Sequence, residues 1–588
     1  MSRQLLLQLT LATAFSAALG GIYSDISDLP TTNYDFIVVG GGTAGPAVAN
    51  RLSQNSQFQV LLVEAGPSNE DVLPAKVPGL MLEMFSGPYE WNYTTIPQPT
   101  MGQRSLPYLR GYILGGCSAH NSMFWSRGTI EDWDRWANVT EDPSWSWQNV
   151  LPVMLKNEHW SEPADRHNQT GEFDPAIHGF HGIVGASLPG YPTELDSRVI
   201  QTTQELDEFP YIIDYNSGTP IGLAWYQGSV KNGARSSAAT AYLAPQYLQR
   251  SNLHVLVNTR VTRVLPASSG TKDFRIVELG KDASSLAQLT ASKEVILSAG
   301  AINSPQILLH SGIGDVADLQ SLGITALHSL PSVGKNFTDQ PYITPVWSTN
   351  SSKPPLNTTA ALEEWQQNRT GPYTMSPTAS NHIAFLRLPD NSTIFETNVD
   401  PAAGPNTPHM ELTPLDNGGL NSPSNGTFVS MGITFLTPTS RGTVTINSTN
   451  PFDPPIIDMN LLASDFDIFT FRESLKASQR FFSAPAWSDF IIESVQPPAN
   501  TTTDNDLDEF LRQNSIPSSH ACGTCAMSAD DAQYGVVNSD LRVKGVTGLR
   551  VVDASVMPFV PAGHLQVPVY VIAEKAAEMI KSDWTTTY

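Results

Sequence analysis

Two histidines near the carboxyl end of the chain, His520 and His564, have side chains that could move protons. An imidazole titrates near pH 6.5, so it can take a proton from a hydroxyl group at neutral or mildly acidic pH. Spacing alone does not separate this pair from structural histidines, because the chain has 12 of them. Asp553 and Ser555 lie near His564, but the G-x-S-x-G turn of many serine hydrolases is absent. No group of His and Cys has the spacing of a zinc site, so we expect no metal.

A glycine-rich turn at residues 40–45 could bind a dinucleotide. The apolar run 34–39 precedes it, a predicted helix at 46–52 follows, and a second apolar run at 60–63 ends at an acid. In such a βαβ unit the glycines allow a tight turn, a close approach to pyrophosphate and close helix–strand packing. The helix N-terminus attracts phosphate, and the acid accepts ribose hydroxyls, which argues against NADP. The residues that we expect to contact the cofactor here are Gly40, Gly42, Thr43, Ala44, Gly45 and Glu64. The motif alone does not decide between FAD and NAD.

Other elements of this fold are predicted far along the chain. Buried strands are expected at 253–257, 294–298 and 549–553, and a helix with an apolar stripe at 568–580. Near-continuous apolar strands are typical of a parallel sheet covered on both faces. The stretches at about 130–230 and 330–515 are rich in Pro, Asn, Ser, Thr and aromatic residues, which favours an antiparallel sheet in a second domain. We therefore predict an α/β fold whose nucleotide-binding domain is assembled from separated pieces of chain.

Charge and cysteine content exclude several classes of function. The 588 residues carry a net charge of −23, which argues against nucleic acid or an anionic membrane as a partner. Three cysteines are too few for a disulfide framework. Cys522 and Cys525 have the spacing of a redox pair but lack the small βαβ context of one, so we expect packed thiols instead.

The amino-terminal residues are typical of a secretory signal peptide. Arg3 precedes an apolar run at 5–11, and small residues at 18–20 could be recognised for cleavage, so the mature chain is expected to begin near Gly21. Asn-X-Ser/Thr sequons follow at Asn92, Asn138, Asn168, Asn336, Asn350, Asn357, Asn368, Asn391, Asn425, Asn447 and Asn500. With a signal peptide, these sequons indicate an extracellular glycoprotein. No other run of 18 apolar residues occurs, so we expect a soluble mature protein.

Several longer stretches resemble the glucose–methanol–choline (GMC) family of FAD-dependent oxidoreductases. Its first signature resembles RGYILGGCSAHN at 110–121, and its second resembles GAINSPQILLHSGIG at 300–314. Its catalytic end resembles residues 520–527, 551–555 and 563–566. The resemblance covers essentially the whole mature chain. It is nearest to the fungal pyranose dehydrogenases, which WNYTTIPQ at 91–98 and GLAW at 222–225 also resemble.

This resemblance implies a Rossmann-type FAD-binding domain and a second α+β substrate domain built on a mostly antiparallel sheet. It divides the chain into a signal peptide at 1–20, FAD-binding segments at 31–125, 231–325 and 516–588, and substrate-domain segments at 126–230 and 326–515. The residues that it places along FAD, besides the glycine-rich turn and its acid, are Trp91, Leu114, Gly116, His120, Asn121, Met123, Val261, Asp553, Ala554, Gln566 and Val567. Tyr112, Cys117 and His120 depart from the residues common in the family.

The departure at His120 is informative, because choline oxidases and pyranose dehydrogenases also have His-Asn here. In those enzymes the imidazole is bonded to the 8α-methyl group of the flavin, and the resemblance implies the same bond at His120. Such a bond withdraws electron density from the flavin and raises its redox potential.

We expect a secreted, monomeric enzyme, and the resemblance implies that it oxidises a sugar or related alcohol. His520 would be the base, His564 would hydrogen-bond the same hydroxyl, and flavin N5 would accept the hydride. A quinone-type compound or oxygen would reoxidise the flavin. An aryl-alcohol oxidase or dehydrogenase of the same family is the main alternative. A flavin-fold hydroxynitrile lyase and a catalytically silent secreted glycoprotein are two further ones.

Overall fold

A computed structural model describes residues 20–378, 380–419, 422–423 and 425–585 of the chain. The predicted signal peptide lies outside these residues except for its last one, Gly20. No helix in the described part of the chain is both long and apolar enough to cross a membrane.

The first of two large sheets contains the strands predicted for nucleotide binding. Its order is β1-β11-β3-β2-β14-β13-β12, and β26 also pairs with β14. The bounds are β1 Gly21–Tyr23, β2 Tyr34–Val39, β3 Val60–Val63, β11 Leu253–Leu256, β12 Arg260–Pro266, β13 Phe274–Gly280, β14 Ala287–Leu297 and β26 Leu549–Val551. Neighbours from β1 to β26 are parallel, whereas β12, β13 and β14 form an antiparallel meander that the sequence did not predict.

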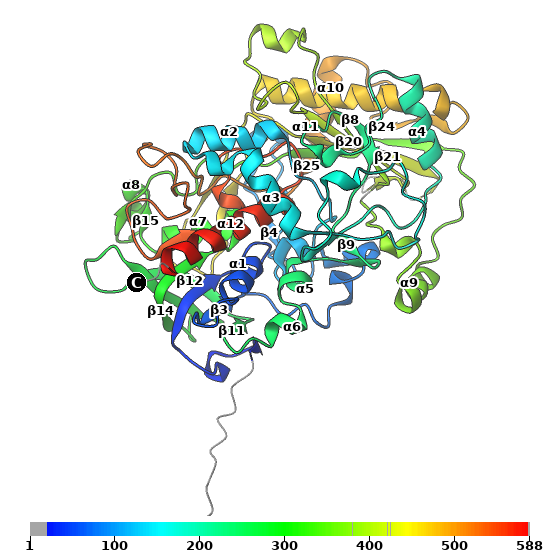
Figure 1. The fold of residues 1–588 in the computed structure, drawn as a ribbon. Coiled ribbons are helices and arrows are strands. Elements are labelled where there is room, and N and C mark those ends of the chain that lie inside the picture. The colour runs from blue at the N-terminus through cyan, green and yellow to red at the C-terminus, as the bar shows by residue number, and fades with distance from the viewer. Residues whose placement is uncertain (1–19, 379, 420–421, 424, 586–588) are drawn as a thin grey trace, which may run out of the picture.

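Helices cover this sheet because its central strands are apolar on both faces. Every residue of β3 is buried, and α1 (Gly45–Leu52) packs against β2 and β3 and also against α12 (Gln566–Thr585). Figure 1 shows these two helices side by side although one begins the nucleotide fold and the other ends the chain. The remaining long helix near this sheet is α7 (Gly300–His310).

The second large sheet is antiparallel throughout. Its order is β24-β18-β21-β20-β19-β8, with β17 pairing β21 and β25. The bounds are β8 Gly222–Trp225, β17 Pro341–Ile343, β18 Val346–Thr349, β19 His382–Leu386, β20 Met410–Leu415, β21 Phe428–Phe435, β24 Ile491–Gln496 and β25 Ile516–Pro517. The helix α10 (Asp465–Phe482) packs its buried phenylalanines on β20 and β21 (Figure 1).

Shorter elements surround the two sheets. The other helices are α2 Ile130–Thr140, α3 Trp147–Asn157, α4 Asp196–Glu205, α5 Ala238–Tyr242, α6 Pro245–Leu248, α8 Val316–Ser321, α9 Thr358–Asn368 and α11 Asp504–Asn514. The small two-stranded pairs are β4 Tyr93–Thr94 with β5 Pro107–Tyr108, β6 Glu158–Trp160 with β7 Val184–Ala186, β9 Val230–Lys231 with β10 Ala234–Arg235, β15 Ile313–Gly314 with β16 His328–Ser329, and β22 Thr443–Thr445 with β23 Ile456–Asp458. The segment boundaries proposed from the sequence stay a prediction.

Candidate active site

Residues from both large sheets line one cavity of about 1200 Å³. Of the residues predicted to bind cofactor or substrate, all line this cavity except Gly45, Leu114 and Val567. Those three lie directly behind its wall: a side chain on Gly45 would meet the carbonyl oxygen of Gly40, Leu114 packs under Gly41, and Val567 is buried in the first turn of α12.

The glycine-rich turn between β2 and α1 has the shape of a phosphate cradle. Gly40 has φ of +101°, which favours glycine, and a Cβ atom on Gly42 would meet no atom within 4 Å. The helix α1 begins without a side-chain cap, so the N–H groups of its first turn have no side-chain acceptor. Glu64, at the end of β3, accepts hydrogen bonds from the N–H groups of Gly41 and Gly66, each at 2.7 Å. Burial nevertheless raises the pKa of Glu64 to about 7.

The loop that contains Gly116 packs against the glycine-rich turn and also contacts the first residue of α12. A Cβ atom on Gly116 would lie 2.6 Å from the Cα atom of Gly42, so only glycine allows this approach. The short 3₁₀ helix η5 (Gly116–Ala119) follows, and then Asn121 donates from Nδ2 to Oε1 of Gln566 at 2.6 Å. The buried guanidinium of Arg235 donates to Oδ1 of Asn121, and burial lowers the pKa of Arg235 to about 10. These contacts hold the predicted FAD residues around Asn121 next to those around Gln566.

Asp553 organises the other side of the cavity. Its Oδ2 atom accepts from Oγ of Ser304 at 2.6 Å and from the N–H of Gly300 at 2.9 Å, and its Oδ1 atom accepts from the N–H of Ser555. Burial raises the pKa of this carboxyl group. Asp553 therefore positions the start of α7 and the residues after β26, rather than acting with His564 as a hydrolase triad.

The hydrogen bonds around His520 fix its tautomer. Nε2 of Gln340 donates to the carbonyl oxygens of Leu436 and Pro561, so Oε1 of Gln340 must face the imidazole, where it lies 2.6 Å from Nδ1. An amide oxygen only accepts, so Nδ1 of His520 carries the proton and Nε2 keeps its lone pair. Burial, then the charges of His564 and Arg110, lower the pKa of His520 well below its ordinary value of 6.5.

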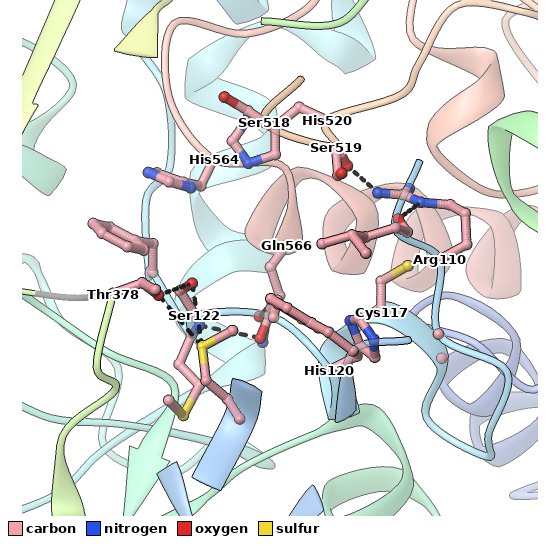
Figure 2. A pocket seen from close by; sticks show the side chains of 18 of the residues that line it. Arg110, Cys117, His120, Ser122, Thr378, Ser518, Ser519, His520, His564 and Gln566 are labelled. Atoms are coloured by element: carbon pink, nitrogen blue, oxygen red, sulfur yellow. Dashed lines mark hydrogen bonds between the residues drawn. The ribbon is translucent and has the colours of Figure 1, made fainter. Parts of the chain in front are cut away.

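His564 is held by a different kind of partner. Its Nε2 atom lies 3.0 Å from Oε1 of Glu411 on β20, and its ring stacks on Phe124 with centroids 4.0 Å apart. Oε2 of Glu411 is buried and has no hydrogen-bond partner among the described residues. The rings of His520 and His564 meet edge to face with centroids 4.8 Å apart, and Figure 2 shows the two side chains close together at one end of the pocket.

His120 lies at the other end of the labelled group in Figure 2, near Cys117. Its side chain lines the cavity and is almost fully buried. Its ring packs against Phe85 with centroids 4.8 Å apart, and its Nε2 atom lies 2.8 Å from Oε2 of Glu90.

Three partner residues were missed by the reading of the sequence: Gln340, Glu411 and Glu90. Each lies far along the chain or in another element from its histidine, and no local motif marks any of them. Cys522 and Cys525 are buried and form no disulfide, which confirms the prediction of packed thiols. Within the described part of the chain, no group of three or more His, Cys, Asp or Glu side chains could hold a metal ion.

Comparison with known proteins identifies the family. GMC oxidoreductase family models match residues 34–342 and 438–573. Pyranose dehydrogenase 3 of Leucoagaricus meleagris is 44% identical, with 97% of each chain covered, and the pyranose dehydrogenase of Agaricus xanthodermus is 44% identical over 96% of this chain and 95% of its own. The glucose dehydrogenase [FAD, quinone] of Drosophila melanogaster is 32% identical over 94% of this chain and 88% of its own.

Solved structures agree with this assignment. A formate oxidase variant from Aspergillus oryzae has a TM-score of 0.85 at 26% identity and covers 95% of this chain and 99% of its own. A fungal aryl-alcohol oxidase has a TM-score of 0.80 at 27% identity and covers 94% of this chain and 100% of its own. The predicted two-domain fold is thereby confirmed. The chain belongs to the GMC oxidoreductase family and is an FAD-dependent oxidoreductase that acts on CH–OH groups.

Proposed function

We propose that this enzyme is secreted and oxidises a hydroxyl group of a pyranose sugar, with FAD bonded to His120 and a quinone-type compound as electron acceptor. The observation that carries the proposal is the histidine pair. His520 and His564 meet at the cavity that the expected FAD residues line, in a chain 44% identical to two pyranose dehydrogenases. The open space at Gly42 and the uncapped start of α1 fit a pyrophosphate group, and Glu64 lies at the end of β3 to receive the ribose.

His520 is the proposed catalytic base. Because Gln340 holds the proton on Nδ1, the lone pair on Nε2 can take the hydroxyl proton of the substrate. Burial favours the neutral form of His520 by lowering its pKa, so the base is unprotonated at neutral pH. When bound, FAD supplies the acceptor for the hydride that leaves the carbon atom. His564, fixed by Glu411, is proposed to hydrogen-bond the same hydroxyl and to share its proton.

A sugar is favoured over an aryl alcohol by the polar groups in this cavity. The side chains of Tyr342, Glu411, Thr413, Ser518 and Ser519 all line it. Such groups can satisfy the several hydroxyls of a pyranose, whereas a benzylic alcohol has a single one.

One contact favours the aryl-alcohol alternative. Phe124 lines the cavity and stacks on His564, so an apolar ring already lies beside the pair. The fold similarity to a fungal aryl-alcohol oxidase points the same way. A hydroxynitrile lyase would use the same histidines as a base without net oxidation.

Anaerobic mixing separates these alternatives. Under nitrogen, pyranose sugars should bleach the flavin absorbance faster than benzylic alcohols at equal concentration, and benzoquinone should restore it faster than oxygen. Faster bleaching by aryl alcohols would favour the alternative oxidase. A flavin that no alcohol bleaches, together with cyanohydrin cleavage, would favour the lyase.

The proposed secretion rests on the amino-terminal pattern and the sequons. Support comes from β1, which begins at Gly21, so cleavage there would leave the edge strand complete. Ten of the eleven sequon asparagines are exposed, as attachment of a glycan requires. Sequencing of the purified native protein should find an amino terminus near Gly21, and an intact Met1 would contradict secretion by cleavage. A monomer is likewise our proposal, which light scattering can test.

A further inference from the structure

We propose that Glu90 is the positioning residue that prepares His120 for covalent attachment to the flavin, by accepting the proton that the imidazole must release. This inference rests on the covalent attachment proposed above. It concerns a residue that no motif marks.

The position of Glu90 sets it behind His120. The His120 side chain lines the cavity, whereas Glu90 does not, so the imidazole lies between the carboxylate and the cavity. Both side chains are almost fully buried, with relative exposures of 5% for His120 and 2% for Glu90. Solvent therefore does not compete for the contact between them.

The two oxygens of Glu90 have different partners. Oε1 accepts a hydrogen bond from the backbone N–H of Arg110, in the segment that pairs with Glu90 through a bridge to Gly111. Oε2 lies 2.8 Å from Nε2 of His120. Despite this short distance, neither atom makes a hydrogen bond to any described residue. A carboxylate oxygen is thus held next to the imidazole with its acceptor capacity unused.

Buried polar atoms without hydrogen bonds are rare in folded proteins, and each one needs a reason. A structural ion pair would align its donor and acceptor, because a buried carboxylate oxygen without a hydrogen bond is energetically unfavourable. A small rotation of the His120 ring would align Nε2 with Oε2. The packing of Phe85 on that ring, at 4.8 Å between centroids, limits its other motions.

The chemistry of attachment requires such an acceptor. A neutral imidazole has one N–H. When its other nitrogen bonds to the 8α carbon, the N–H proton must leave for the imidazole to become neutral again. One C–H bond of the 8α methyl group breaks in the same conversion, and its electron pair reduces the flavin ring. The ring takes up the two protons, and dioxygen or a quinone then removes two electrons and two protons and becomes hydrogen peroxide or a hydroquinone. When Nδ1 bonds to the 8α carbon, the proton leaves from Nε2, and Oε2 of Glu90 lies 2.8 Å from that atom to accept it.

The test measures attachment of FAD directly, with the purified enzyme. Wild type, Glu90→Gln and Glu90→Asp are produced in riboflavin-starved cells, so that FAD has not yet been attached, and are then mixed with FAD in air. The fraction of flavin that stays with acid-precipitated protein is then followed over time, and intact mass confirms one added FAD. The matched control is Glu158→Gln, which removes the charge of another buried carboxylate that contacts a histidine, His178, while neither residue lines the cavity.

We expect attachment in Glu90→Gln to slow at least about 100-fold, the lower range for loss of a general base. The attachment rate of Glu90→Asp should be intermediate, because the carboxylate is kept but its side chain is one methylene group shorter. Glu158→Gln should attach FAD as wild type does. Attachment in Glu90→Gln at the wild-type rate would overturn the proposal, and if that variant does not fold, a wild-type rate in Glu90→Asp would overturn it. Release of FAD from acid-precipitated wild type would instead refute the covalent bond itself.

Discussion

Replacing Gln340 with methionine tests whether a hydrogen bond sets the protonation of the base. The side chain of Gln340 is fully buried and makes three hydrogen bonds: one from Nδ1 of His520 and two to the carbonyl oxygens of Leu436 and Pro561. Methionine has a similar volume, so Gln340→Met removes these bonds without opening a large cavity. The imidazole can then carry its proton on Nε2. In that tautomer Nε2 has no lone pair with which to take the substrate proton.

The size of the effect follows from the lost acceptor. An unsatisfied buried donor costs about 1–3 kcal/mol, and this energy is the preference that now holds the proton on Nδ1 of His520. Since 1.4 kcal/mol corresponds to a factor of about ten, flavin reduction should slow by about 5- to 150-fold. Substrate binding should change less, because Gln340 does not line the cavity.

Stopped-flow spectroscopy under nitrogen measures this rate, and flavin absorbance before mixing shows whether the cofactor site is intact. Gln340→Asn serves as the comparison, since it keeps an amide but cannot reach as far. The reasoning would be refuted if Gln340→Met folded, bound FAD and reduced its flavin as fast as wild type.

Four further predictions follow from other contacts. Glu411→Gln replaces a charged acceptor of His564 with a neutral one, so anaerobic flavin reduction should slow about tenfold for a loss of about 1.4 kcal/mol; an unchanged rate would show that the charge is not used. Wild-type reduction should stay constant as pH falls through 6.5 and decline only at lower pH, because burial lowers the pKa of His520 well below that value; stopped-flow rates across pH check this. His178→Gln should lose about 3–5 kcal/mol of stability, because the buried Asp214 then has no ion-pair partner among the described residues and Glu158 keeps only Arg127. Burial opposes charge on His178, yet its hydrogen bonds raise its pKa, so the difference in Tm from wild type should shrink as pH rises through that pKa; calorimetry measures it. Asn336 should carry no glycan, because its amide accepts from Arg441 and donates to the carbonyl oxygen of Pro558, and peptide mass spectrometry should find it unmodified.

The nucleotide-binding elements could be predicted from the sequence because their signals are local. A few adjacent residues at the turn at Gly40 and in the strand before it indicate both which element forms and where it lies. The bounds of β2 and α1 accordingly lie within one residue of the predicted ranges. The predicted helix at 568–580 proved longer, at Gln566–Thr585, because its polar ends lack the apolar stripe that marks its centre. The β12–β13 hairpin was missed because only near-continuous apolar runs were taken as strands of this sheet, whereas β12 has charged residues such as Arg263 beside Val264.

The partners of the histidines could not be predicted, because they depend on contacts between distant segments. Gln340 is 180 residues from His520, and Glu411 is 153 residues from His564. A sequence motif reports which residues stand next to one another, whereas tautomer and charge depend on what packs against an imidazole in the folded chain. The resemblance named the histidines, and the structure added the amide and the carboxylate that distinguish them.

The most direct test of the central claim, that Nε2 of His520 takes the substrate proton, is the rate of flavin reduction by a pyranose under nitrogen in wild type and His520→Ala. Loss of a positioned general base typically costs 10²- to 10⁴-fold, about 3 to 5 kcal/mol of barrier. We predict a loss of at least about 100-fold with the flavin spectrum unchanged. His564→Ala should cost a similar factor, and the double variant much less than the product, because both act on one hydroxyl. Reduction of the His520→Ala flavin at the wild-type rate would contradict the account and assign the base to another group, with His564 the first candidate.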